Sequence, residues 1–347
     1  MLTCQNDVNI AHMIISPIYR APLYCEGPYP HMIKLSVVVS SYNNNEYIQE
    51  CLDSILPHLN DSTELLIVDD GSTDNSHEII QNTIRNTENK NIVFTIVEHA
   101  GISEVRNKAI SYVKGEYILF IDGDDILDVK FWESITPELY NNYDIIEYDA
   151  TIFFENNKNN SKHLKICAFE NECTITHFSQ LSRVFSLSNW FTWARVYKTE
   201  LFKRNHVTFP KGRIYEDMAT LPYLYAAATR VRSIKESLIW YRKSLRSLTS
   251  TSRSSDIEDI IYAMECIRKL DLDCADRRSV LALAIYSSYN LIKSLLIKNP
   301  EYEISEINIR RIKDVMTPFQ KEYSLKKSLQ IKFLKYYLKY IFIKKKR

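Results

Sequence analysis

Glycine is scarce in this chain, which contains six glycines among 347 residues. They lie at positions 27, 71, 101, 115, 123 and 212. No two have the spacing G-x-G-x-x-G or G-x-x-x-x-G-K, which excludes the glycine-rich loops that cradle phosphates in dinucleotide- and ATP-binding proteins. A nucleotide diphosphate bound by this chain would therefore need another source of positive charge.

Cysteine pairs and long apolar runs are also missing. The seven cysteines are scattered and contain no C-x-x-C pair, so neither a structural zinc site nor a disulfide framework is indicated, and a reducing cytosol fits best. The longest uncharged run in the helical second half, residues 279–292, is shorter than the roughly 20 apolar residues that span a bilayer. We therefore expect no transmembrane helix.

Charge is distributed unevenly along the chain, although its formal net charge is only +1. Residues 321–347 hold ten of the 44 Lys and Arg residues and one of the 43 Asp and Glu residues, which gives this tail a charge of +9. The rest of the chain, with 34 basic and 42 acidic residues, carries −8. A body this acidic is a poor candidate for binding nucleic acid.

The chain divides into four expected regions. Residues 1–33 contain four prolines and no consistent periodicity, and they lack the basic start and long apolar core of a secretory signal. We expect an appendage there, with Met32 a candidate for the natural start. A regular domain is expected over residues 34–250, a helical region over 251–320 and a basic amphipathic tail over 321–347.

From residue 35 to about residue 131, apolar strand-like runs alternate with short amphipathic helices. Strands are expected at LSVVVS, ELLIVD, IVFTIVE and EYILFID, and helices at EYIQECLDSIL, DNSHEIIQNTI and SEVRNKAISYV. This pattern is typical of a parallel sheet covered on both faces, so the predicted fold class is α/β, doubly wound and mostly parallel, followed by a helical C-terminal region. Residues 144–170, which alternate weakly around a polar segment, are expected to form a β-hairpin.

Polar segments follow the four expected strands. They are residues 40–43 (SSYN), 69–72 (DDGS), 98–101 (EHAG) and 122–125 (DGDD). A single acidic loop could be a helix cap, but sheets of this kind bind ligands at the carboxyl ends of their strands. Four polar strand ends in register predict a crevice. No histidine has metal-ligand spacing, and none is assigned a role.

The segment EYILFIDGDDILD, residues 116–128, runs from an apolar strand directly into three carboxylates around one glycine. Carboxylates this close repel one another unless a cation or hydrogen-bond donors compensate them. A turn followed by a helix cap is the simpler interpretation of an isolated D-G-D. Here the neighbouring strand end carries Asp69 and Asp70, which favours a divalent cation, Mg²⁺ or Mn²⁺, held by Asp122 and Asp124 and completed by phosphate oxygens.

Several segments together resemble family 2 glycosyltransferases of the GT-A fold, which are inverting enzymes that use nucleotide sugars and are common in bacterial surface-polysaccharide assembly. The segments are KLSVVVSSYNNNEYIQECLDSI, ELLIVDDGSTDNS, ISEVRNKAI, GEYILFIDGDDIL, WARVYKTELF and YEDMATLPYLY. The similarity covers roughly residues 34–250. One departure is Ser40, which stands where the family usually has proline.

The resemblance implies roles on the donor side. Tyr42 and Asp70 would contact the nucleobase, Arg106 would support that side of the pocket, Asp122 would meet the ribose or the metal, and Asp124 would ligate the metal. An aromatic ring can stack on a base and a carboxylate can accept the imide N–H of uracil, which favours UDP. Without the resemblance, Arg106 reads equally well as an ordinary solvated helix residue.

The resemblance places the catalytic base at Asp217, with Glu216 as a neighbouring or acceptor contact. By position alone this acidic pair would serve the dipole of the helix that it opens. Trp193 could stack on a sugar or lie in the core. Arg242 and Arg246 resemble the family's mobile loop, whose cation can close over the pyrophosphate, and a solvated basic loop is the alternative. The expected acceptor is a hydroxyl of a glycan or a lipid-linked molecule, in a hexosyl or N-acetylhexosaminyl transfer.

Two other functions were weighed. Phosphoaspartyl hydrolases of the haloacid-dehalogenase type also place D-x-D after a strand, but they require Thr or Val two residues after the second Asp, where this chain has Ile126. A catalytically inactive scaffold that binds nucleotide sugars would be expected to lose Asp124 or Asp217, and both are present.

The basic tail predicts an amphipathic helix. Lys332, Lys335 and Lys339 share one face; the opposite apolar surface comprises Leu325, Leu329, Phe333, Tyr336, Tyr337 and Tyr340, widened by Ile331, Leu334, Leu338 and Ile341. This pattern, with the terminal KKKR cluster, favours the surface of an anionic membrane and a cytoplasmic, peripheral location. The alternatives are packing of the apolar side on the body, with the lysines in solvent, and docking against the acidic body.

Overall fold

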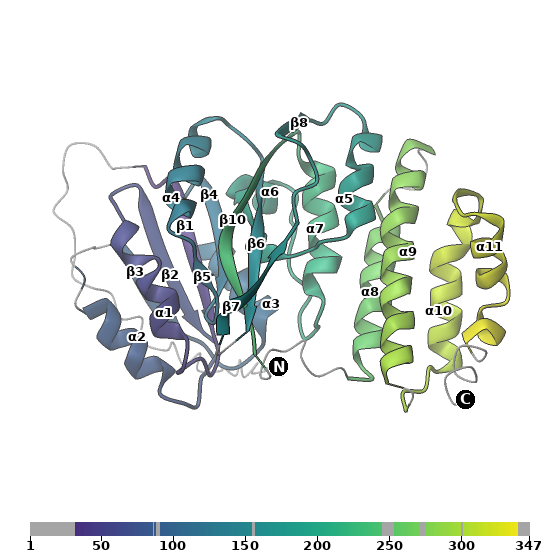
Figure 1. The fold of residues 1–347 in the computed structure, drawn as a ribbon, viewed down its shortest axis with the longest axis horizontal. Coiled ribbons are helices and arrows are strands. Elements are labelled where there is room, and N and C mark those ends of the chain that lie inside the picture. Colours follow the sequence, from purple (N-terminus) through teal and green to yellow (C-terminus); the bar gives the residue numbers. More distant parts are fainter. Residues whose placement is uncertain are drawn as a thin grey trace, which may run out of the picture.

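The computed structural model describes residues 32–85, 87, 91–154, 157–244, 253–270, 275–299 and 301–338. Figure 1 shows a sheet with helices packed against it, followed by a row of helices that leads to the C-terminus. The expected appendage up to residue 31 lies outside the described residues, as do Arg246 and residues 339–347 of the tail.

Four parallel strands begin the fold, as predicted. They are β1 (Leu35–Ser41), β2 (Thr63–Asp69), β3 (Ile92–Ile96) and β4 (Tyr117–Asp122), in the spatial order β3-β2-β1-β4. Every residue of β1 is buried, because helices cover both of its faces. Period-two alternation sends Val37 and Val39 to one core and Val38 to the other.

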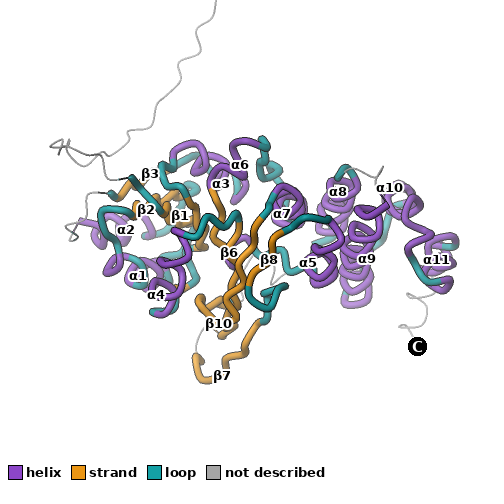
Figure 2. The backbone as a smooth tube through the Cα atoms, turned by 90° about the horizontal axis from the view of Figure 1, so that it is seen from above, coloured by secondary structure: helices purple, strands orange, loops and turns teal. Residues whose placement is uncertain are grey.

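The helices between these strands divide between the two faces of the sheet (Figure 2). Helices α1 (Ile48–Asp53) and α2 (Ser76–Arg85) place Ile48 and Ile80 in the core that contains Val37. Helix α3 (Ile102–Tyr112) places Val105 and Ala109 in the core that contains Val38. The predicted doubly wound arrangement is confirmed.

The sheet continues beyond β4 with mixed directions. Its further members are β9 (Arg195–Lys198), β6 (Ile145–Phe154), β10 (Arg230–Lys243) and β5 (Ile126–Leu127), in that order. Strand β7 (Asn157–Leu164) pairs antiparallel with β6, which confirms the predicted hairpin, and β8 (Glu172–Thr174) pairs with β10. Strand β10 pairs with β6 in parallel and with β5 antiparallel, so it brings residues from late in the chain beside the loop that follows β4.

Helices fill the rest of the described chain. They are α4 (Lys130–Ile135), α5 (Ser182–Leu187), α6 (Thr199–Arg204), α7 (Glu216–Ala227), α8 (Asp256–Arg268), α9 (Ala275–Lys298), α10 (Glu306–Met316) and α11 (Leu325–Lys332). Helices α8, α9 and α10 lie side by side in Figure 1. One apolar core runs without interruption from Val38 on β1 to Leu338 beyond α11.

No transmembrane helix was expected, but helix α9 meets the length and composition criteria for one. Its residues Asp276–Lys298 are long and apolar enough to cross a membrane by length and composition. More than half of the most apolar stretch is buried, however, and Val280, Ile285 and Ile292 pack in the core that begins at Val38. The core helix of a globular protein has the same properties.

Part of the predicted apolar surface of the tail packs against the rest of the protein. Ile331, Leu334 and Leu338, which were expected to widen the apolar surface, are buried in the core, in agreement with the alternative that the apolar side packs on the body. The reason is that α11 lies against α10 and the 3-10 turn Thr317–Glu322, which cover this side of the helix. Leu325, Leu329, Phe333 and Tyr336, from the same predicted apolar surface, are exposed.

Candidate active site

The carboxyl ends of β1, β2 and β4 lie together because the three strands are parallel and in register. Ser41 pairs with Asp69, and Ser40 pairs with Asp122. The backbone N–H of Gly123 donates to the carbonyl oxygen of Ser40 at 2.8 Å, and a Cβ at position 123 would lie 3.0 Å from that oxygen. Residues 122–125 are called the acidic loop below. Glycine is needed at position 123 for this loop to pass so close to β1.

Arg242 on strand β10 holds the acidic loop in place. Its backbone N–H donates to Asp125 Oδ1 at 2.8 Å, and its Nε donates to the carbonyl oxygen of Asp124 at 2.7 Å. Its guanidinium also pairs with Glu50 on α1 at 2.5 Å. Arg242 is buried on strand β10, so the prediction that it belongs to a mobile loop is wrong, and the side chain anchors the loop instead.

Two carboxylates of the acidic loop have raised pKa values. Burial, followed by the charge of Asp122, raises the pKa of Asp124 to about 7. Burial and the charges of Asp124 and Asp122 raise the pKa of Asp125, whose Oδ2 is buried without a hydrogen-bond partner. A carboxylate whose charged form is disfavoured by its carboxylate neighbours would be stabilised by a cation.

Two carboxylates fit the way in which Mg²⁺ and Mn²⁺ are usually held beside a substrate diphosphate. Such ions take one or two carboxylates and complete their shell with phosphate oxygens and water. In the part of the chain that the structure describes, no group of three or more His, Cys, Asp or Glu side chains could hold a metal. The expectation that Asp122 and Asp124 hold a divalent cation stays a prediction.

A buried arginine joins the acidic loop to helix α7. Arg106 Nη2 donates to Asp122 Oδ1 at 3.1 Å, and Nη1 donates to Glu216 Oε1 at 2.6 Å. The guanidinium also lies over the ring of Phe209, and its side chain is only 4% exposed. Arg106 was expected to support the nucleobase side of the pocket. In the structure it connects the end of β4 with the start of α7.

Asp217 lies in the first turn of α7, beside this connection. Tyr215 precedes the helix in the left-handed conformation, with φ of 61°, which turns the chain sharply before Glu216. Asp217 Oδ1 accepts a hydrogen bond from the N–H of Met218 at 2.7 Å. Burial and the charge of Glu216 raise the pKa of Asp217, and Arg106 opposes this rise. A carboxylate with a raised pKa is a stronger proton acceptor than an ordinary one.

The expected nucleobase side is built from three strand ends. Asp70 accepts hydrogen bonds from the N–H groups of Ala100 and Gly101, both at 2.9 Å. His99 stacks on Tyr42 with ring centroids 4.2 Å apart, and its Nδ1 lies 2.8 Å from Asp70 Oδ2. His99 had no predicted role, although its segment is one of the four polar strand ends.

Trp193 is buried rather than open to a sugar. It lies in the 3-10 turn Thr192–Ala194 and stacks with Phe191 and Tyr241, at centroid distances of 5.0 and 4.8 Å. Its role as an acceptor contact therefore stays a prediction.

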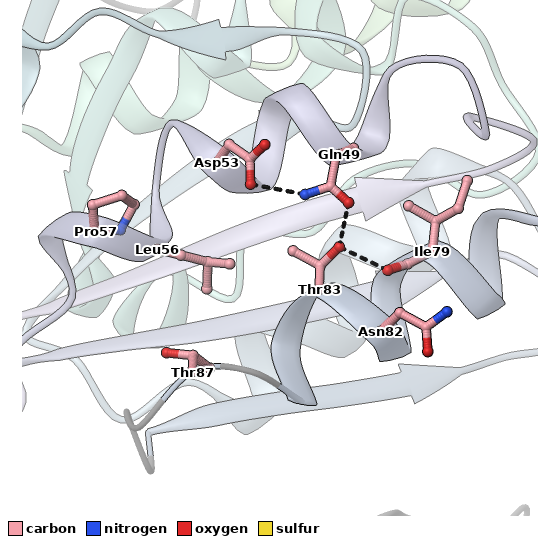
Figure 3. Close-up of a pocket in the computed structure, with 8 residues that line it drawn as sticks. All are labelled: Gln49, Asp53, Leu56, Pro57, Ile79, Asn82, Thr83 and Thr87. Carbon is pink, nitrogen blue, oxygen red and sulfur yellow. Dashed lines mark hydrogen bonds between the residues drawn. The ribbon is translucent and has the colours of Figure 1, made fainter.

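One hollow of the surface lies apart from the strand ends of the candidate site. It has a volume of about 680 Å³ and lies between α1 and α2 (Figure 3). Its lining residues are Gln49, Asp53, Leu56, Pro57, Ile79, Asn82, Thr83 and Thr87. Gln49 hydrogen-bonds Asp53 and Thr83 within it. This hollow shares no residue with the acidic loop or α7, so it is not part of the candidate active site.

Comparison with known sequences agrees with the resemblance noted in the sequence. The family model "Glycosyl transferase family 2" matches residues 36–217. Glycosyltransferase GlyG of Streptococcus pneumoniae is 31% identical over 62% of this chain and 73% of its own length. Poly(ribitol-phosphate) beta-N-acetylglucosaminyltransferase TarS of Staphylococcus aureus is 25% identical over 72% of this chain and 43% of its own length, so the chain spans less than half of that relative.

Comparison with solved structures supports the fold. Residues 1–349 of S. aureus TarS, in a crystal structure with UDP-GlcNAc, superpose with a TM-score of 0.66. The match covers 84% of this chain and 82% of that chain at 20% sequence identity. At this identity the likeness establishes the GT-A architecture, with the helical region that follows the sheet.

We predict that replacing Arg106 with leucine destabilises the protein by about 3–5 kcal/mol, because it leaves Glu216 and Asp122 without their buried cation. Urea unfolding followed by fluorescence measures this. The double variant Arg106→Leu/Glu216→Leu should recover a large part of the loss, since it removes the stranded charge as well. An unchanged unfolding midpoint in the single variant would contradict the structural role.

Proposed function

The chain belongs to glycosyl transferase family 2 and has the GT-A fold, and from this membership we propose that it transfers a sugar, with inversion, from UDP-sugar to a hydroxyl of a glycan or lipid-linked acceptor. The family match removes the phosphoaspartyl hydrolase alternative. The observation that carries the proposal is the bridge from Asp122 through Arg106 to Glu216, which brings the expected donor side and the expected base side together.

In the proposed reaction, the acceptor oxygen attacks the anomeric carbon while the bond between that carbon and the diphosphate oxygen breaks. Asp217 takes the proton from the acceptor hydroxyl as the new bond forms. Arg106 and Glu216 hold α7, and with it Asp217, against the end of β4. One in-line displacement of this kind inverts the anomeric configuration.

The donor would be held by groups from several strand ends. We assign Tyr42 and Asp70 to the nucleobase, and Asp122 and Asp124 to a Mg²⁺ or Mn²⁺ ion that would supply charge for the leaving diphosphate. Arg242 would keep the acidic loop in place from strand β10. Arg246 would close over the pyrophosphate. Turnover separates this function from an inactive scaffold that only binds nucleotide sugars.

The tail suggests where the protein acts. Leu325, Leu329, Phe333 and Tyr337 line an open hollow of about 500 Å³ together with Lys326 and Gln330. The sequence from residue 321 onward has a strong excess of lysine and arginine over acidic residues. We propose that this surface docks on an anionic membrane, so that the protein is peripheral on its cytoplasmic face.

For the base, we predict that Asp217→Asn lowers turnover by about 10²–10⁴-fold, because the amide keeps the shape but cannot accept the proton. Release of UDP from a panel of UDP-sugars in Mn²⁺ measures this rate. The affinity for UDP, measured by calorimetry, should stay close to that of the unmodified protein. A full rate in the variant would move the role to Glu216.

For the metal, we predict that Asp124→Ala abolishes both nearly all transfer and the dependence of transfer on divalent cation, because the leaving diphosphate loses its charge compensation. Activity across a titration of MnCl₂, and in EDTA, measures this. Asp61→Ala, at an exposed position away from the crevice, is the control. Full activity of the unmodified protein in EDTA would contradict the metal requirement.

For the membrane, we predict that the protein floats with anionic vesicles at low salt but not with neutral ones, and that Leu329→Glu/Phe333→Glu reduces this binding at least tenfold. Both side chains are exposed, so the fold should survive. Removal of the whole tail is unsuitable, because Ile331, Leu334 and Leu338 belong to the core. Ile307→Glu, an exposed apolar position on α10, is the control. Equal flotation of all three proteins would show that the tail does not dock.

A further inference from the structure

The imidazole of His99 contacts both residues that the proposed function assigns to the nucleobase. Its ring lies nearly parallel to that of Tyr42, with an interplanar angle of 17° and a centroid distance of 4.2 Å. Its Nδ1 lies 2.8 Å from Asp70 Oδ2 and 3.1 Å from the backbone carbonyl oxygen of Asp70. One side chain thus combines an aromatic stack with a contact to the carboxylate.

A uracil bound at these residues would use the same two kinds of contact. It presents a flat ring that can stack on tyrosine and a single imide N–H that a carboxylate can accept. The imidazole likewise presents a flat ring and a ring N–H. The residues expected to recognise the base are therefore already engaged by a side chain that imitates it.

The remaining hydrogen bonds of Asp70 limit what else it can accept. The N–H groups of Ala100 and Gly101 occupy one position on each oxygen. His99 Nδ1 hydrogen-bonds the backbone carbonyl oxygen of Asp70 and lies 2.8 Å from Oδ2. A carboxylate offers about four acceptor positions in all. His99 therefore covers Oδ2 until it leaves, and the backbone donors fix the orientation of the carboxylate throughout.

Departure of His99 would not require the core to open. Its side chain is 55% exposed, and Tyr42 is 42% exposed. The backbone of this loop is held independently, because Ala100 and Gly101 anchor it to Asp70 through their own N–H groups. The imidazole can rotate into solvent while the loop stays in place.

We propose that His99 is a placeholder for the nucleobase: it occupies the stacking surface of Tyr42 and the acceptor position on Asp70 until a base that replaces both contacts displaces it. This inference rests on the proposed function. Because the free energy needed to displace His99 is the same for every base, His99 lowers the affinity for the base. The preference among bases depends on how well each one replaces the stack on Tyr42 and the N–H donor to Asp70. Uracil supplies both, whereas cytosine has an acceptor nitrogen where uracil has the imide N–H.

The test compares uridine and cytidine binding, by calorimetry in Mn²⁺, in the unmodified protein and in His99→Ala. Removing the placeholder should tighten uridine binding about three- to tenfold, because the base no longer competes with a stacked and hydrogen-bonded ring. His99→Phe keeps a competing ring without the N–H and should bind uridine more weakly than His99→Ala. In all three proteins uridine should bind more tightly than cytidine.

His58→Ala is the matched control, because His58 also stacks on an aromatic ring, that of Trp132, at 5.3 Å and 18°, but away from the crevice. This variant should bind uridine as the unmodified protein does. Uridine binding that is unchanged or weaker in His99→Ala would contradict the proposal that His99 is a placeholder. Weaker binding would show instead that His99 belongs to the wall that holds the base. Failure of the folded, unmodified protein to bind either uridine or UDP would instead overturn the proposed function and this inference with it.

Discussion

The active-site geometry depends on the buried guanidinium of Arg106. The end of β4 and the start of α7 are far apart in the sequence, and each brings carboxylates to the crevice. Pressed together in a weakly solvated place, Asp122, Glu216 and Asp217 would repel one another. Arg106 lies between Asp122 and Glu216 and offsets part of that repulsion. Because one planar group bonds both carboxylates, it also fixes the distance between the two elements.

A second arginine performs a similar task on the other side of the acidic loop. Arg242 bonds the backbone of Asp124 and the carboxylate of Asp125, and it pairs with Glu50 on α1. The acidic loop is thus fixed from α3 through Arg106 and from β10 through Arg242. Even so, burial and the charge of Asp122 raise the pKa of Asp124. In the proposed function, a cation bound beside Asp124 would favour the charged form of this carboxylate.

The sequence predicted those parts of the fold that local pattern determines. Strands such as β1 were predictable because their continuous β-branched residues suit a sheet buried on both faces, and the acidic strand ends followed from the parallel topology. The position of Arg242 was not, because it depends on the pairing of β10 with β5 and β6, which no local pattern encodes. The contact of His99 with Tyr42 and Asp70 likewise joins three strand ends. For the tail, periodicity predicted the helix but not which part of its apolar surface would pack against α10.

The uninterrupted core has a consequence for how the protein unfolds. Val38 on β1, Leu281 on α9 and Leu338 after α11 belong to one apolar cluster, so the sheet and the C-terminal helices share buried surface. Elements that share a core lose their stabilising contacts together, which makes a single cooperative thermal transition the expectation for the two parts. A weakening at either end of the cluster is then felt at the other. The C-terminal helices are therefore expected to help hold the strand ends of the candidate site in place.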